Sequence, residues 1–460
     1  MDERLIGQIG DLVAARNWPA VAEIGRGGLA AGGTSSERAH YLAANCMAAR
    51  MLGLTEDARR TYDHSIGSIR APDHPRLFPI LATAAIASDA CDDLERLFRM
   101  QFPHARFRRI SISPLGTFTS WCRENAITTT VIPPESFDVT GSHSWSYTSD
   151  PFEIAVIPGA EFISGWDYVI APTGHVLADS GYMPPEVAFP KFFPQVPVPA
   201  VGLIGHASDA ETIDLPGRVL FLSVPEQFHV GHWLVDFLPR LRALMHVPAG
   251  VKVALPHEAP RKFFEMLSLF GIDGDRLALC ELGKRYRAQS LVVARPGNYF
   301  RPRPSTIRTL HRVLGPPANP LRKPARRLFF ERGAKSRQIM NRADVDAVLE
   351  EFGFTTINLA HLSVAEQRTL LEDTEIAVGA FGSDLHSAYF MPENSSVLEL
   401  IWDAAKDPVT RSNCQIMGIR HEFLICADAG TSQQQGHQKD RDFVVDCADL
   451  KTALRGLLKL

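Results

Sequence analysis

The sequence predicts an α/β protein in which two open α/β domains follow an all-α region, and three observations carry this prediction. The first hundred residues place apolar residues at three- and four-residue spacing, as helices do. Further along, β-branched runs alternate with helical patterns, which is typical of crossover units on a parallel sheet. A proline-rich segment, residues 315–326, interrupts this alternation and is the expected boundary. The predicted domains are residues 1–107, 108–318 and 319–460.

The helical region contains one clear helix-turn-helix unit, residues 37–52 and 56–66 around a turn at Gly53. Small residues such as Ala43 and Ala48 permit close helix packing, and the pattern resembles tetratricopeptide-like repeats. Such an array would offer a surface for a protein partner. An unspecialised helical cap is the alternative.

The two α/β domains are expected to differ in the elements with which they begin. The β-rich start of the middle domain includes a hairpin with its turn at residues 172–174. Its later elements are strand 219–223, helix 227–246, strand 251–255, helix 260–270 and strand 291–294. The last domain should contain strand 327–331, helix 343–352, strand 355–358, helix 363–373, strand 376–378, helix 384–390, strand 396–400, strand 443–445 and helix 450–460. That final amphipathic helix is a candidate to pack back on the middle domain.

Charge and cysteine usage limit the partners and the compartment. A net charge of −4 provides no overall cationic field, so nucleic acid is not an expected partner. The seven scattered cysteines include no Cys-x-x-Cys pair, which favours a reducing cytoplasm. No run approaches the ~20 apolar residues that span a bilayer, so we expect no transmembrane segment and only peripheral membrane association through a partner.

The first chemical motif lies where a strand leads into a helix. His232 and Asp236 stand four residues apart and should share one helix face, with His229 one turn earlier. A carboxylate beside an imidazole is a plausible general base, and we assign Asp236 as the base with His232 tuning it. A metal site is the alternative reading of these residues, but no further cluster at zinc-like spacing supports it.

This motif and six later pieces, in order, resemble glycosyltransferase family 61 over residues 110–450. The first is His-Trp-Leu-x-Asp-x-Leu-Pro-Arg-Leu, starting at His232. The others are Phe329-Phe330-Glu331-Arg332, Arg337 with Asn341, Gly353-Phe354, Leu362-Ser363 with Glu366-Gln367, Gly379-Ala380-Phe381-Gly382 and Val397-Leu398-Glu399-Leu400. The resemblance implies a GT-B-like fold of two Rossmann-type domains facing a crevice. It also implies inverting, metal-independent transfer from a nucleotide sugar, and suggests Asn341 as a further candidate site residue.

The residues of the last domain agree with a nucleotide-sugar donor site. Arg332 and Arg337 follow a strand, where guanidinium groups can pair with a diphosphate. Backbone N–H groups of a small-residue turn before a helix can receive phosphate, and Glu399, at a strand end, can accept hydrogen bonds from ribose hydroxyls. The donor-binding candidates are Arg332, Arg337, Gly382, Ser383, Asp384 and Glu399.

One departure from the family pattern falls at residues 381–387. The family usually has His-Gly-Ala-Gly-Leu-Thr-Asn where this chain has Phe-Gly-Ser-Asp-Leu-His-Ser. Phe381 therefore removes an imidazole, and His386 is the nearby candidate to replace it. An altered donor, a reoriented site and a lost activity all remain open.

We expect an inverting, metal-independent glycosyltransferase that moves a sugar from a nucleotide donor, UDP-linked, to a glycan acceptor in bacterial-type surface or capsular polysaccharide synthesis. No cofactor is expected. The alternative is a catalytically degenerate relative that binds a partner through its helices. An NAD-dependent enzyme is disfavoured because no Gly-x-Gly-x-x-Gly follows a strand.

Overall fold

The structure is a computed structural model, and it divides into two compact units. It describes residues 8–459 except 10, 13–14, 16, 71–76, 89, 91, 94–95, 98–108, 117, 142–143, 166–167, 178–179, 181–200, 207–211, 223–228, 299, 318–322, 333–336, 403–407 and 430–441. The first unit is Met1–Thr128, Val156–Val219 and Leu279–Val293, and the second is Thr129–Ala155, Leu220–Ala278 and Ala294–Leu460. The expected boundary at 318/319 therefore falls inside the second unit.

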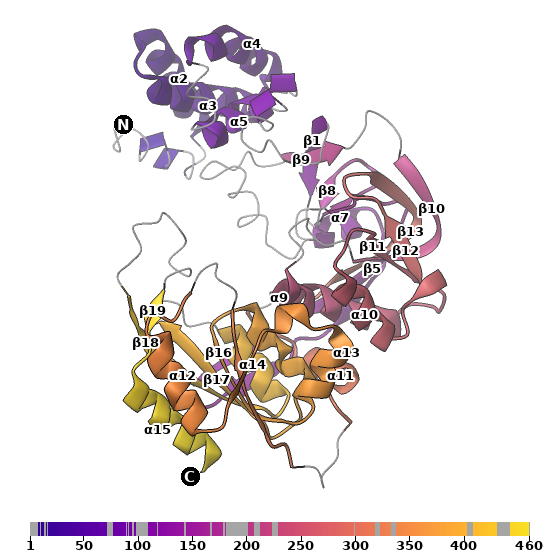
Figure 1. Cartoon of the computed structure of the whole chain (residues 1–460). Helices are drawn as coiled ribbons and strands as arrows, with labels where there is room; N and C mark the ends of the chain where they lie inside the picture. Colours follow the sequence, from indigo (N-terminus) through magenta and orange to yellow (C-terminus); the bar gives the residue numbers. More distant parts are fainter. Residues whose placement is uncertain are drawn as a thin grey trace. The chain divides into compact units, whose positions relative to one another are not determined.

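The first unit begins with a helical cluster around its own apolar core (Figure 1). Its helices are α2 (Trp18–Ala31), α3 (Ser35–Met51), α4 (Thr55–Ser65) and α5 (Phe78–Ala87). Thr34 and Glu37 form a reciprocal capping box at the start of α3, which satisfies N–H groups that would otherwise lack partners. Gly53, with a φ of 78°, makes the turn into α4. The expected helix pair is confirmed, whereas its repeat class stays a prediction.

The sheet strands of the first unit pair in both directions. The strands are β1 (Arg109–Gly116), β6 (Glu161–Ile163), β7 (Val169–Ile170), β8 (Val176–Leu177), β9 (Val201–His206) and β13 (Arg285–Arg295), with α7 (Phe118–Glu124) after β1. β7 and β8 form the expected hairpin, closed by a 2.8 Å bond from Gly174 N to Ala171 O. β1 pairs with β8 in parallel but with β9 antiparallel, and β13 pairs antiparallel with β6. The sheet that β13 joins is therefore mixed, and the parallel arrangement expected among strands 219–223, 251–255 and 291–294 stays a prediction.

The second unit opens with two antiparallel pairs and continues into α/β segments. Its strands here are β2 (Thr129–Ile132), β3 (Ser136–Val139), β4 (Trp145–Thr148), β5 (Phe152–Pro158) and β11 (Lys252–Pro256), with α10 (Arg261–Leu269) and α11 (Pro304–Leu314). β10 (Thr212–Phe221) lies mostly in the first unit, and β12 (Leu277–Cys280) is divided between the two units. Several of these strands also contain residues of the first unit.

The helix expected at 227–246 is a composite rather than a single α-helix. It runs as α9 (Val230–His232), a π turn η4 (Trp233–Phe237) and a 3₁₀ segment η5 (Leu238–Met245). Pro239 explains the change, because it has no N–H to continue the regular hydrogen-bond ladder. Residues 227 and 228 lie outside the described residues.

The last part of the second unit is the region in which the sequence prediction is most accurate. Its sheet order is β15-β14-β16-β17-β18-β19, parallel from β15 to β18 and antiparallel at β19. The strands are β14 (Arg326–Phe330), β15 (Thr355–Ile357), β16 (Thr374–Ala380), β17 (Ser396–Trp402), β18 (Arg420–Asp428) and β19 (Phe443–Val444). The helical elements are α12 (Arg342–Glu351), η7 (Leu359–His361), α13 (Val364–Leu371), η8 (Ser383–Phe390), α14 (Pro408–Ile416) and α15 (Cys447–Leu458).

The final helix packs on this sheet rather than on the middle domain. Leu450, Leu454 and Leu457 of α15 are buried in the core that β14, β16 and β17 share with α12. Figure 1 shows α12 and α15 together beside the sheet. The apolar face of α15, which suggested packing on the middle domain, packs instead on the adjacent sheet.

Candidate functional site

The base-side motif forms a close side-chain pair within the second unit. His232 Nδ1 lies 2.7 Å from Asp236 Oδ2, and the His232 side chain is 35% exposed whereas that of Asp236 is 4% exposed. Burial raises the pKa of Asp236, and the neighbouring His232 and Arg240 oppose that effect. The structure therefore brings the two predicted residues together, with the imidazole as the more accessible member.

The segment that carries this pair packs directly on η8. A Cβ added at Gly231 would lie 2.7 Å from Ser383 Oγ and 3.2 Å from His386 Cδ2. A larger residue at this position would require the Ser383 side chain to shift. The motif around residue 232 and the turn around residue 383, far apart in sequence, are thus neighbours.

Two arginines converge on one backbone oxygen at the end of β16. Arg332 Nη1 and Arg337 Nη1 donate to the carbonyl oxygen of Phe381 at 3.2 and 2.9 Å. Gly382, with a φ of 148°, lies so close that an added Cβ would collide with the Arg332 guanidinium. Arg337 itself adopts a φ of 61°, which is unusual for a residue with a side chain. The backbone here is shaped to hold two cations side by side.

Phe381, the departure from the family pattern, is a packing residue in this structure. Its ring is 6% exposed and meets Trp402 edge-on with centroids 5.7 Å apart. The Arg337 guanidinium carbon lies 4.7 Å from the Phe381 ring centroid, a cation–π contact. The aromatic ring thus supports one of the arginines that we expected to bind the donor.

Asp384 lies next to these cations at the start of η8, and the sequence did not identify all of its neighbours. Burial raises its pKa, while Arg332 and then Lys262 lower it. Lys262 of α10 donates from Nζ to the carbonyl oxygens of Leu359 and Ala360 at 2.8 and 3.0 Å. Sequence reasoning missed Lys262 because no local pattern marks a lysine that reaches the site from another element.

The remaining histidine candidates lie at the same junction. His386 is partly buried with a fully buried Nδ1, and burial followed by the charge of His232 lowers its pKa to about 4. His229 precedes α9 at an exposed position, with its ring centroid 6.1 Å from that of His232. The structure therefore places His229 and His386 near His232.

Two predicted site residues have different surroundings. Asn341 donates to Val445 O at 2.8 Å and accepts from Val445 N at 3.0 Å, so it ties the start of α12 to the segment after β19. Glu399 was expected at a strand end, but it is the fourth residue of β17 and 0% exposed. Its Oε2 lies 2.9 Å from Nε2 of the equally buried His421. A side chain with no exposed area cannot touch ribose in this conformation.

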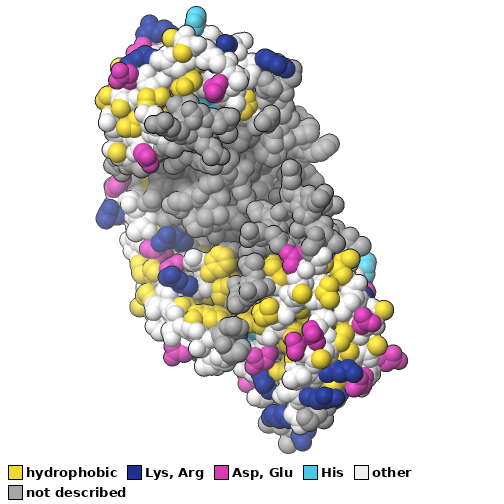
Figure 2. Space-filling model, turned by 90° about the vertical axis from the view of Figure 1, so that its left-hand side faces the viewer, with side chains coloured by type: hydrophobic (Ala, Val, Ile, Leu, Met, Phe, Trp, Pro, Cys, Tyr) yellow, Lys and Arg dark blue, Asp and Glu magenta, His cyan; other side chains and the backbone are white. Residues whose placement is uncertain are grey.

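Three further observations concern the surface charge, possible metal ligands and membrane-spanning helices. Figure 2 shows basic and acidic side chains interspersed over the described part of one face. No group of three metal-ligating side chains gathers among the residues that the structure describes. Within the same residues, no helix has both the length and the apolar character to cross a bilayer.

Comparison with known proteins matches this site to a family of transferases. Residues 230–398 match the family model described as Glycosyltransferase 61. The matched range contains the His232–Asp236 pair, both arginines and Gly382. A comparison with curated proteins finds no match. The family match supports a glycosyltransferase, and the geometry of the matched residues can be interpreted on that basis.

Proposed function

We propose that the protein is an inverting glycosyltransferase that moves a sugar from a nucleotide-sugar donor to a glycan acceptor. One observation carries the proposal: the segment with the His232–Asp236 pair packs, through Gly231, on the segment that follows the two converging arginines. A proton acceptor and an anion-binding turn are thus adjacent, as a displacement at a sugar carbon requires.

The donor diphosphate is proposed to bind at the turn after β16. Arg332 and Arg337 are already oriented by the Phe381 carbonyl, and guanidinium groups match phosphate oxygens in pairs. Gly382 lets the Arg332 guanidinium lie directly against the backbone, and Ser383 and Asp384 begin the next helical segment. Lys262 adds a third positive charge nearby. The burial of Glu399 favours an indirect role, in which it supports the strand below this turn.

Within the proposed reaction, the exposure of the pair favours His232 as the group that takes the acceptor proton. The sequence motif instead predicts Asp236 as the base. Because Asp236 is almost completely buried and 2.7 Å from Nδ1, it is better suited to orient the imidazole and stabilise its charged form. Both residues remain essential in this proposal, with exchanged roles.

The proposed transfer needs no metal, because the arginines can neutralise the leaving diphosphate. A chelator should therefore leave the rate unchanged. Loss of activity with a chelator and recovery with manganese would contradict this part of the proposal.

The cellular setting is also a proposal. A UDP-linked donor and a polysaccharide acceptor of the bacterial surface or capsule fit the family resemblance, and both would be available at the cytoplasmic face of a membrane. The helices α2 to α5 would then serve to bind a protein partner there.

Phe381 favours a second candidate function, a catalytically degenerate relative that works as a partner-binding module. Its ring is buried against Trp402 and offers no hydrogen bond to a donor. In this case the helical region would bind a partner and the site would be unused.

A panel of nucleotide sugars separates the two candidates. A ligand that binds only the folded protein raises its melting temperature, so a UDP-sugar should do so in a thermal-shift assay. Transfer or slow hydrolysis of the same donor, followed by release of the nucleotide, would support the enzyme. If no nucleotide sugar shifts the melting temperature or is consumed, the transferase proposal is wrong.

A further inference from the structure

Helix α11 connects the two sides of the candidate site through polar contacts at its two ends. At its N-terminal end, Arg242 Nη1 of η5 donates to Ser305 Oγ at 2.6 Å and to Thr306 Oγ1 at 3.1 Å. Arg242 belongs to the composite helical segment that carries His232 and Asp236. The base side is therefore attached to the start of α11.

The other end of α11 holds the donor side. His311 Nε2 lies 2.9 Å from the carbonyl oxygen of Met391, the residue that follows η8, and the His311 side chain is buried. Burial lowers the pKa of His311, so the imidazole is neutral and donates to this carbonyl at neutral pH. An α-helix of this length extends about 16 Å at ~1.5 Å per residue, and its backbone is stiff. The helix also packs along both η5 and η8.

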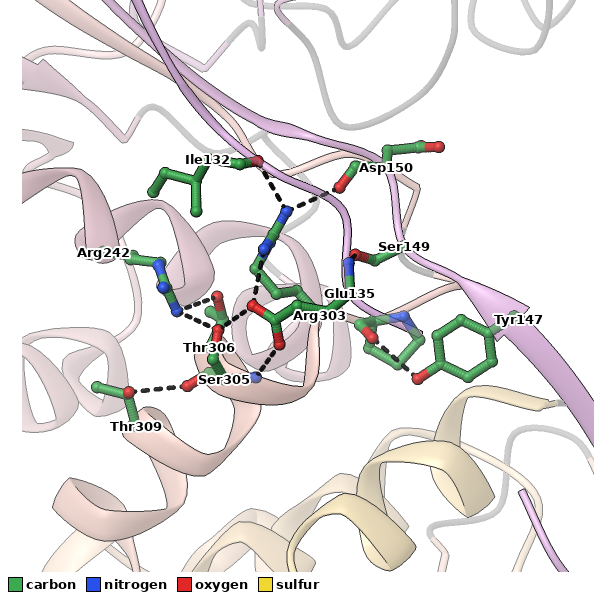
Figure 3. A network of polar contacts seen from close by, with 11 residues as sticks. Ile132, Glu135, Tyr147, Ser149, Asp150, Arg242, Arg303, Ser305, Thr306 and Thr309 are labelled. Carbon is green, nitrogen blue, oxygen red and sulfur yellow. Dashed lines mark hydrogen bonds and ion pairs between the residues drawn. The ribbon is translucent and has the colours of Figure 1, made fainter. Parts of the chain in front are cut away.

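Glu135 fixes the N-terminal end of this helix (Figure 3). Its carboxylate accepts from Arg303 Nη1 at 2.7 Å and from the backbone N–H of Ser305 at 2.8 Å, and it also contacts Ser305 Oγ. These contacts hold the pKa of Glu135 below its usual range in spite of its partial burial. A carboxylate at a helix N-terminus also interacts favourably with the helix dipole.

Arg303 extends the anchor to the strands at the start of the second unit. Its Nη2 donates to the carbonyl oxygens of Ile132 and Asp150 at 3.0 and 3.1 Å, and its side chain is 2% exposed. Figure 3 shows these bonds converging from the strand segments on the first turn of α11. The start of the helix therefore has several charge-assisted bonds and little freedom to shift.

We propose that α11 is a strut that sets the distance between the His232–Asp236 pair and the donor turn, which is the turn after β16 that contains Gly382. Arg242 is the positioning residue that holds the segment of the pair on α11. The inference rests on the proposed transferase function. In this proposal Arg242 acts through its contacts with α11 and not on a reactant. Its loss should change the approach of the base to the acceptor while the donor turn, held by its own backbone, keeps its shape.

Arg242→Met tests the strut, because it removes both hydrogen bonds and keeps most of the side-chain volume. Arg308→Met is the matched control, since Arg308 lies on the exposed face of the same helix. We expect Arg242→Met to lower kcat by roughly 10- to 100-fold, the effect of a misplacement of about 1 Å, with an unchanged Kd for the nucleotide sugar. Arg308→Met should match the wild type in both quantities.

The outcomes separate the strut from the transferase proposal. If the wild type binds and turns over a donor but Arg242→Met does so equally well, the strut is wrong and the function stands. An equal loss of kcat and donor affinity would also contradict it, because the donor turn would then depend on Arg242. A wild type without donor binding contradicts the function itself.

A milder variant covers the case in which Arg242→Met does not fold. Thr306→Val replaces one hydroxyl acceptor of the Arg242 guanidinium by a methyl group. Hydrogen exchange should then become faster in residues 233–245 but not in residues 374–380 of β16. Unchanged exchange in residues 233–245 would overturn the proposal.

Discussion

The two sides of the candidate site are held in place by different kinds of structure. On the donor side, the Phe381 carbonyl, the positive φ of Gly382 and the positive φ of Arg337 fix the cations through the backbone. On the base side, a side-chain pair in an irregular helical segment sets the geometry. We therefore expect the backbone geometry of the donor turn to determine nucleotide binding, and the orientation of the His232–Asp236 pair to determine the rate of turnover.

The largest expected effect tests the base side. His232→Gln and Asp236→Asn should each lower kcat by about 10²–10⁴-fold, the usual contribution of a positioned base and its orienting group, with little change in donor Kd. Exposed His246, just after η5, supplies the control His246→Gln. Near-normal turnover in both pair variants, measured under donor saturation, would remove the pair from the mechanism.

The donor side should show the opposite response. Arg332→Ala should weaken nucleotide binding by about 1.5–3 kcal/mol, or roughly 10- to 150-fold, the range for hydrogen bonds to charged groups. Arg326→Ala removes an exposed arginine of the same strand region and should not change binding. Titration calorimetry with a nucleoside diphosphate measures the affinity of both variants. Equal affinities would show that Arg332 does not bind the nucleotide.

The backbone of the donor turn can be tested at Gly382. Gly382→Ala forces a Cβ into the Arg332 guanidinium and places a side chain at a φ of 148°. We expect a loss of about 1–3 kcal/mol in the free energy of unfolding, the cost of a residue in a sparsely populated backbone region. Gly456→Ala on α15 meets open space and is the control. Urea denaturation that gives equal stability for both variants would contradict the assigned geometry.

The smallest expected effect concerns pH and the junction between the two sides. Burial lowers the pKa of His386 to about 4, from an ordinary value of 6.5. Below pH 6.5 the unfolded chain binds a proton that the folded chain refuses, so this residue makes stability decrease as pH falls towards about 4. His386→Gln should reduce the slope of unfolding free energy between about pH 7 and pH 5. An unchanged slope would indicate that this imidazole is well solvated.

The sequence predicted most of the C-terminal sheet because its parallel strands alternate with helices along the chain, but it missed α14 and the strand β18. The composite form of residues 230–245 was not predictable by periodicity, since Pro239 changes the hydrogen-bond pattern without changing the spacing of apolar residues. Sheet direction in the first unit also escaped prediction, because pairing joins distant segments such as β6 and β13. A local sequence pattern does not indicate which distant segments pair with one another.

The same limit applies to the site. The arginines and Gly382 were predicted from their places after strands, and the structure brings them together. We expected Glu399 to contact the donor from the end of a strand. The strand continues past Glu399, and its side chain is buried against His421. Lys262 and Arg242 were missed, since each acts through a contact with an element far away in the chain.

We infer that a nucleotide sugar binds against the turn after β16, with the His232–Asp236 pair facing its sugar. A crystal structure of the protein with a nucleotide sugar, or with its nucleoside diphosphate, tests this most directly. We predict phosphate oxygens within hydrogen-bonding distance of Arg332 or Arg337 and beside Gly382. A nucleotide bound elsewhere, with this turn unoccupied, would contradict the account.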